Sequence, residues 1–378
     1  MPNRVHDWQG DLRREGMSTS TSFLHCNSTN VRVCQLRRRA LQIFFDFLWN
    51  TTPTLTKRVA KRLLFSPSHY KTTPVENHYL ESGSRFQISV HGKAVKCWKW
   101  GSGPSILLAH GWNGRGIQLH HFIEPLLYKG YSVIAYDAPG HGESEGKTSS
   151  YFEFTDAIRT LLNTSNGHHI QGVIAHSLGA SATVNSMVKE NNPLEVVLIA
   201  PALRLAEVLY FYFHHIGVPK GLFQSLIREY EDQFGYNMHR DNPSNLLKEV
   251  ESRILIVHDK NDPTIPYGDS KKLSDEFQNI TLHATERLGH KKILTERSII
   301  DLAINFFTHT EGKKMVSTEH ILEQYRKANF DRRLNLFLEC PSLRASFMEI
   351  DQKEMAGENS CETCGTADPA AKGANCSW

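Results

Sequence analysis

The sequence lacks the features that mark several large classes of protein. No G-x-x-x-x-G-K-[ST] or G-x-G-x-x-G motif follows a predicted strand, which excludes the common nucleotide-binding sites. The seven cysteines are odd in number and have no framework spacing, which argues against a disulfide scaffold and favours a reducing compartment. There is no internal repeat, and the net charge of +3 over 378 residues predicts no nucleic-acid partner.

The sequence also predicts no secretory signal and no membrane-spanning helix. The stretch "LRRRALQIFFDFLW" places three arginines before an apolar run, but Asp46 interrupts the run, which is too short to span a bilayer. Residues 1–70 carry 11 Lys and Arg against 4 Asp and Glu, so the basic excess belongs to the N-terminal region. We expect a cytoplasmic protein, with a location at the inner face of the membrane as the alternative.

Two interpretations of this basic region stay open. We favour an amphipathic helix that is packed over the fold or is partly disordered; the alternative is a peripheral membrane contact through residues 36–65. In the second case the arginines face the lipid head groups, and an apolar set points into the bilayer: Phe44, Phe45, Phe47, Leu48 and Trp49.

Beyond residue 75 the pattern is that of an α/β domain. A hairpin is predicted from strands at 85–90 and 94–100. Six short apolar strands then alternate with helix-length segments, which indicates a parallel sheet covered by helices on both faces. The strands are expected at 105–110, 132–137, 172–177, 195–200, 253–259 and 280–286, and the helices at 117–129, 151–164, 178–190, 267–278 and 293–308.

These patterns divide the chain into three parts. Residues 1–74 are a basic, partly helical extension, residues 75–311 are the α/β domain, and residues 312–378 are a helical extension ending in a polar tail. An insertion of about 50 residues at 201–252 separates two strands of the domain. The tail contains Cys361, Cys364 and Cys376; incidental cysteines are favoured over a zinc site, because no fourth ligand lies at a recognised spacing.

The stretch "GVIAHSLGA" at 172–180 places a serine at a strand-to-helix corner. A serine hydroxyl needs a base to accept its proton and N–H donors for the oxyanion that follows. A sharp turn into a helix supplies both, but it leaves little room two residues before and after the serine. Ala175 and Gly179 occupy those two positions. Ser177 is therefore the predicted nucleophile.

The acid and the base follow in the order that this corner requires. "HDKNDPTIP" offers Asp259 at a strand end and Asp262 in the next turn, and we predict that Asp262 orients the base while Asp259 shapes the turn. "LGHKKIL" supplies His290 as the base. The backbone N–H groups of Trp112, in the loop "HGWNG", and Leu178 are the predicted oxyanion donors.

The motifs "HGWNG", "DAPGHGES", "AHSLGA", "HDKNDPTIP" and "LGHKKIL", in this order, resemble the α/β-hydrolase superfamily. The sequence is most similar to bacterial lysophospholipase-like and ring-cleavage-hydrolase-like members, over roughly residues 75–310. The resemblance implies an eight-stranded, mostly parallel sheet, with a helical lid after the sixth strand that matches 201–252. We interpret "DAPGHGES" as a structural turn, and we expect Asp137 and His141 to form no metal site.

We therefore expect a serine hydrolase that cleaves a carboxylic ester, or else a thioester, of a small apolar substrate, with no cofactor and no metal. Tyr210, Phe211 and Phe213 of the insertion, with His176, are candidate substrate contacts; packing of the lid onto the core is the alternative for the aromatic residues. Two other functions stay open: a catalytically silent fold used as a binding module, and a membrane-associated lysophospholipase.

Overall fold

The computed structural model describes residues 31–68, 71–163, 169–190 and 194–308. All described residues belong to one compact unit. The predictions for residues 312–378, including the three cysteines of the tail, lie outside the described residues. No helix in the described part of the chain combines the length and apolarity needed to cross a bilayer.

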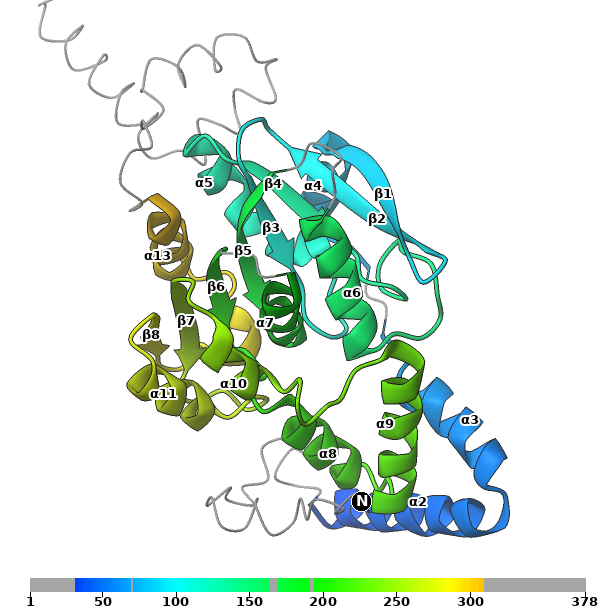
Figure 1. Ribbon diagram of the computed structural model, residues 1–378. Coiled ribbons are helices and arrows are strands. Elements are labelled where there is room, and N and C mark those ends of the chain that lie inside the picture. Colours follow the sequence, from blue (N-terminus) through cyan, green and yellow to red (C-terminus); the bar gives the residue numbers. More distant parts are fainter. Residues whose placement is uncertain (1–30, 69–70, 164–168, 191–193, 309–378) are drawn as a thin grey trace, which may run out of the picture. The chain divides into compact units, whose positions relative to one another are not determined.

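Eight strands form one sheet in the order β1-β2-β4-β3-β5-β6-β7-β8 (Figure 1). The pairs β1–β2 and β2–β4 are antiparallel and all other pairs are parallel, so the predicted eight-stranded, mostly parallel sheet is confirmed. The strands are β1 Ser84–Val90, β2 Lys93–Trp100, β3 Ser105–Ala109, β4 Ser132–Tyr136, β5 Ile170–His176, β6 Glu195–Ile199, β7 Ile254–Asp259 and β8 Ile280–Thr285.

The predicted hairpin is present, and its turn explains its sequence. His91 and Gly92 connect β1 to β2 with φ values of 49° and 75°. A two-residue hairpin turn with both residues at positive φ matches the right-handed twist of the strands, and glycine reaches that conformation without steric cost.

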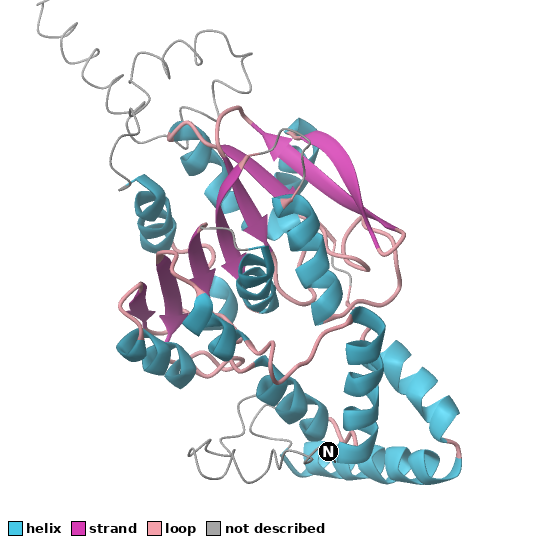
Figure 2. Cartoon of the chain, viewed as in Figure 1, coloured by secondary structure: helices cyan, strands magenta, loops and turns pink. Residues whose placement is uncertain are grey.

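Helices cover both faces of the sheet (Figure 2), as the continuous apolar strands predict. In β3, Leu107 and Ala109 pack into the core on one face, whereas Ile106 and Leu108 pack into the core on the other. The first face is covered by α6 Tyr151–Leu162 and α7 Leu178–Glu190, and the second by η1 Gly116–Phe122, α5 Ile123–Tyr128 and α13 Arg297–Thr308. At the edge of the sheet, α11 Tyr267–Glu276 packs against β7 and β8.

The last helix of the domain begins later than the sequence predicts. A single helix was expected over 293–308, but the structure has a short helix α12 Gly289–Lys292 and a separate α13 Arg297–Thr308. The carbonyl of Glu296 accepts the N–H groups of both Ile299 and Ile300, so the helical hydrogen-bond pattern of α13 starts at that residue.

The insertion between β6 and β7 is helical and packs against the N-terminal region (Figure 1). The insertion contains α8 Leu205–His215, α9 Lys220–Phe234, α10 Pro243–Leu246 and η2 Leu247–Glu249. The N-terminal region contains α2 Val31–Thr51, α3 Pro53–Leu64 and α4 Pro74–Ser82. Phe65, which follows α3, lies 4.6 Å from the ring of Tyr230 in α9 and 5.7 Å from that of Phe213 in α8.

The apolar residues of α2 do not share one face, so the grouping of all five toward a bilayer is wrong. Phe45 is buried in the core at 4% exposure, and Trp49, one turn later, packs against the same core. Phe44 and Phe47 are 49% and 66% exposed. Each helical residue advances by about 100°, so the two pairs lie on different sides of the helix. The preferred interpretation of α2, a helix packed over the fold, therefore agrees with the burial of Phe45.

Candidate active site

Ser177 lies at the corner between β5 and α7, in a backbone conformation that residues other than glycine rarely adopt. Its φ is 54°, in the left-handed region. A Cβ atom on Gly179 would overlap the carbonyl oxygen of His110 and lie 2.7 Å from that of Ala109, and one on Gly111 would lie 2.9 Å from the Ser177 Cβ. The turn thus brings two chain segments so close that only small residues fit around the serine.

The structure brings Ser177, His290 and Asp262 together, although 113 residues separate the first two. The Nε2 atom of His290 lies 3.0 Å from the Ser177 hydroxyl oxygen, and its Nδ1 atom lies 2.8 Å from Oδ2 of Asp262. Because a carboxylate only accepts hydrogen bonds, Nδ1 carries the proton and Nε2 is free to accept the proton of the serine. These are the contacts that a base acting on the hydroxyl requires.

Asp262 is held as a charged acceptor. Its side chain is fully buried, and Oδ1 accepts the backbone N–H groups of Thr264 at 2.7 Å and Ile265 at 3.0 Å. Nε2 of His258 lies 3.5 Å from Oδ2. Burial raises the pKa of Asp262, but the hydrogen bonds from His258 and His290 outweigh burial, and the net pKa lies below the usual range.

The other candidate carboxylate, Asp259, serves the backbone instead. Its Oδ1 accepts the N–H of Asn261 at 2.9 Å, and its Oδ2 accepts the N–H of Leu288 at 2.9 Å and the hydroxyl of Thr285 at 2.8 Å. Asp259 therefore ties the turn after β7 to the loop that presents His290, and it makes none of the recorded contacts with the imidazole.

The loop after β3 lies directly against the serine, as the close approach of Gly111 shows. Among the described residues, the backbone N–H groups of Trp112 and Leu178 have no hydrogen-bond partner, and their role as oxyanion donors stays a prediction. His110 braces this loop: its Nε2 accepts the N–H of Ala138 at 2.9 Å, so its Nδ1–H donates to the Gly111 carbonyl at 2.8 Å. Burial lowers the pKa of His110 to about 4.

The same loop is tied to the N-terminal region through Asn113. Its φ is 58°, a conformation that asparagine tolerates better than most residues. Its side-chain oxygen accepts the backbone N–H of Ser68 at 2.7 Å. This contact could not be predicted from the sequence, because it joins a residue of the loop to a segment 45 positions away.

His176, predicted as a substrate contact, is packed against His290, the predicted base. Its ring centroid lies 4.7 Å from that of His290, and its Nε2–H donates to the His290 carbonyl at 2.9 Å. It is 5% exposed, and burial together with the nearby His290 lowers its pKa to about 3. The ring is therefore neutral and fixes the backbone of His290; its contact with substrate stays a prediction.

The aromatic residues of the insertion lie among one another. Tyr210 is buried, with its ring 5.4 Å from that of Phe223, and its hydroxyl oxygen has no hydrogen-bond partner among the described residues. The ring of Phe213 lies 5.5 Å from that of Phe223 and 5.7 Å from that of Phe65. Phe211 is partly buried. Their role in substrate binding stays a prediction, and so does the role of the insertion as a lid.

The segment "DAPGHGES" holds the backbone beneath the site. Asp137 is fully buried and accepts the N–H groups of Gly116 and Glu143, each at 2.8 Å, with Arg115 at 3.3 Å. Burial raises the pKa of Asp137, and Arg115 opposes that shift. His141 is also buried, with its ring 5.1 Å from that of Trp112. Within the described ranges, no group of three or more His, Cys, Asp or Glu side chains is placed to hold a metal ion.

Three comparisons relate this chain to known proteins. The non-heme chloroperoxidase of Streptomyces lividans is 25% identical over 254 residues, which cover 53% of this chain and 91% of that protein. The lysophosphatidylserine lipase ABHD12 of Xenopus tropicalis is 25% identical over 238 residues, covering 55% of this chain but only 58% of the lipase. The esterase Pf2001 of Pyrococcus furiosus has a TM-score of 0.48 and 17% identity, covering 66% of this chain and 98% of the esterase.

The sequence also matches a family model. The model is described as the alpha/beta hydrolase family, and it covers residues 106–297, from the first parallel strand to the start of the last helix of the described chain. That range is half of the chain and includes the serine corner, the carboxylate and the histidine. The chain belongs to the α/β-hydrolase family.

Proposed function

We propose that this chain is a serine hydrolase that cleaves a carboxylic ester of a small, largely apolar substrate through an acyl-enzyme intermediate. The observation that carries the proposal is the continuous hydrogen-bond path from Asp262 through His290 to Ser177. The name of one relative, a lysophosphatidylserine lipase, supports ester cleavage, whereas another relative is a non-heme chloroperoxidase. A thioester is the second candidate substrate class.

The proposed mechanism follows from these contacts. The Ser177 oxygen attacks the ester carbonyl carbon while His290 Nε2 takes the hydroxyl proton, and Asp262 stabilises the imidazolium. The negative charge on the carbonyl oxygen is met by the N–H groups of Trp112 and Leu178. Collapse of this intermediate breaks the carbon–oxygen bond, and His290 returns its proton to the departing alcohol. Water then attacks the acyl group on Ser177 by the reverse proton transfers, which releases the acid.

An active-site label tests this proposal against the silent-fold alternative. The full chain is incubated with a fluorophosphonate, and the adduct is located by mass spectrometry of peptides. We expect one adduct on Ser177, absent from Ser177→Ala and retained in Ser274→Ala, a partly exposed serine on α11. A folded chain that gives no adduct, or an equal adduct in His290→Ala, would contradict an activated serine. A series of p-nitrophenyl esters and the matching thioesters then ranks acyl length and leaving group.

We further propose that α2 contacts a membrane surface, which favours a lipid ester as substrate. Its outer face exposes Leu36, Ile43, Phe44 and Phe47, with exposures from 49% to 69%. Their spacing of seven, eight and eleven residues from Leu36 places them on one side of a helix. The N-terminal region that carries this face is basic, which suits anionic head groups.

Vesicle sedimentation of the full chain tests the membrane contact. Phe44→Ser combined with Phe47→Ser removes the largest exposed side chains of the face, and Val75→Ser removes an exposed apolar residue on α4 as the control. We expect the double variant to stay in the supernatant while the control pellets like the wild type. The proposal would be contradicted if the wild type, the double variant and the control pelleted equally, or if none of them pelleted.

A further inference from the structure

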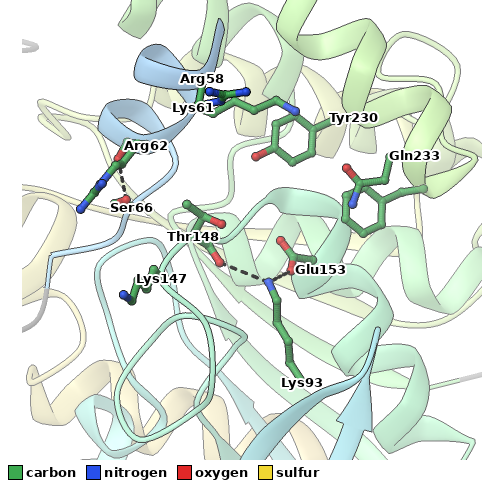
Figure 3. Close-up of a pocket in the computed structure, with 11 residues that line it drawn as sticks. Arg58, Lys61, Arg62, Ser66, Lys93, Lys147, Thr148, Glu153, Tyr230 and Gln233 are labelled. Atoms are coloured by element: carbon green, nitrogen blue, oxygen red, sulfur yellow. Dashed lines mark hydrogen bonds and ion pairs between the residues drawn. The ribbon is translucent and has the colours of Figure 1, made fainter. Parts of the chain in front are cut away.

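A hollow of the molecule lies between the N-terminal region, the core and the insertion. It has a volume of about 590 Å³ and is lined from α3, β2, the loop before α6, α6 itself and α9 (Figure 3). Five of its lining residues are cationic, and Glu153 is the only carboxylate among them. The cationic residues are Arg58, Lys61, Arg62, Lys93 and Lys147.

Two of the five cations are neutralised by the protein. Lys93 lies 2.5 Å from Oε1 of Glu153 and also reaches the Thr148 carbonyl, as Figure 3 shows. Glu153 is 5% exposed, and its other oxygen accepts the hydroxyl of Ser150 at 3.0 Å, so each of its two oxygens already has a donor. Lys61 lies 2.5 Å from Oε1 of Glu229 on α9.

The remaining three, Arg58, Arg62 and Lys147, have no hydrogen bond or ion pair from their side chains to any described residue. Arg58 and Arg62 are four residues apart on α3, a spacing at which like charges repel. Lys57 and Lys61 have the same spacing, but both oxygens of Glu229 lie between them, at 3.8 and 2.5 Å. The protein thus balances one repelling pair on α3 and leaves the other facing an open hollow.

We propose that this hollow binds a phosphate group, carried either by a small soluble ester or by an anionic lipid head group. Guanidinium groups match phosphate oxygens in geometry as well as charge, and a bound phosphate would do for Arg58 and Arg62 what Glu229 does for the lysines. The hollow is larger than one phosphate group. The rings of Tyr230 and Phe234, stacked with their centroids 6.0 Å apart, offer an apolar wall for the organic group that carries the phosphate.

An anion bound in the hollow would contact three segments of the chain at once. Its walls come from α3 of the N-terminal region, α9 of the insertion and the core, so a bound anion would hold three segments together. The chain runs on from α3 to Phe65, packed on Tyr230, and then to Ser68, which binds the loop beside Ser177. The proposal itself concerns binding and does not depend on the hydrolase activity.

The test measures binding by the full chain, with activity playing no part. Calorimetry is run with inorganic phosphate and with phenyl phosphate, and sedimentation with phosphatidylcholine vesicles with or without phosphatidylglycerol. The test variant is Arg58→Gln with Arg62→Gln, and the matched control is Arg85→Gln with Arg297→Gln, two exposed arginines outside the hollow. Lys147→Gln serves as a second test variant on a different segment.

We expect at least about tenfold weaker binding in the test variant than in the control, from the loss of two charge-assisted contacts. Saturable binding of phenyl phosphate identifies a soluble ester as the ligand. If the arginine variant loses binding only to vesicles that contain phosphatidylglycerol, the ligand is a lipid head group. The same loss must then occur when the arginine substitutions are made in the Phe44→Ser with Phe47→Ser background. Binding that is equal in test and control variants, or absent with every probe, would overturn the proposal.

Discussion

Two buried histidines beside the site should make the fold sensitive to mild acid. Burial lowers the pKa of His110 to about 4 and that of His176 to about 3, against about 6.5 in the unfolded chain. As the pH falls below 6.5, the unfolded state therefore binds one more proton per histidine than the folded state. Each one then removes about 1.4 kcal/mol of unfolding free energy per pH unit, until the folded pKa is reached. At pH 5 the pair removes about 4 kcal/mol.

Other buried groups also change the unfolding free energy with pH, and some act in the opposite direction. The contribution of one histidine is therefore measured by comparing a variant with the wild type. The pKa of Asp137 is raised by burial, so the folded state takes up its proton first and gains stability as the pH falls. His176→Gln keeps an N–H for the His290 carbonyl but does not titrate. Urea unfolding of the full chain between pH 7.5 and 4.5, followed by tryptophan fluorescence, should show its slope between pH 6 and 5 reduced by about 1.4 kcal/mol per unit.

The control is His283→Gln, which removes an exposed histidine on β8. Its slope should match that of the wild type. If His176→Gln also kept the full slope, then His176 would not be held neutral in the folded state. The explanation of its role, an uncharged ring that supports the backbone of His290, would then be refuted.

Three other predictions test the site and the packing of α2. Asp262→Asn should lower kcat for a p-nitrophenyl ester by about 10³- to 10⁴-fold with the fold intact, because the imidazole loses its orienting acceptor; a change below tenfold would contradict the assignment. Gly111→Ala should lower kcat without altering the circular dichroism spectrum, since its Cβ would lie 2.9 Å from that of Ser177; wild-type activity would refute the close approach. Phe45→Ala should cost about 3–5 kcal/mol of unfolding free energy and Phe44→Ala less than about 0.5 kcal/mol, and equal costs in urea unfolding would contradict their different burial.

The sheet and the serine corner could be predicted because short-range sequence determines them. A strand buried on both faces must be apolar at every position, as "SVIAY" of β4 is, and such runs are recognised without knowing their neighbours. The corner is equally local, since its backbone strain restricts the residues two positions away from Ser177. The order of the carboxylate and the histidine then follows from the order of the strands.

The supporting residues could not be predicted, because they act across long separations. With 20 histidines in the chain, nothing local distinguishes His258, which lies beside Asp262, or His110, which braces the loop after β3. The basic hollow could not be predicted for the same reason, since its walls come from separate segments between residues 58 and 234. The two faces of α2 could not be assigned either, because apolar residues occur on both sides of that helix and only packing decides which side is covered.

The N-terminal region has an inner and an outer side, and these call for different experiments. On the inner side, Phe45, Ala60 and Phe65 belong to the same core as the strands, and the Phe65 carbonyl accepts the N–H of Ser149 at 2.8 Å. Each buried phenylalanine alone is worth about 3–5 kcal/mol. A chain begun near residue 70 would lose these contacts together with the hydrogen bond from Ser68 to Asn113, so a loss of membrane binding in it would not separate recognition from unfolding. Substitution of Phe44 and Phe47 on the outer side changes the exposed surface and leaves the core contacts in place, which makes the point variants the decisive test.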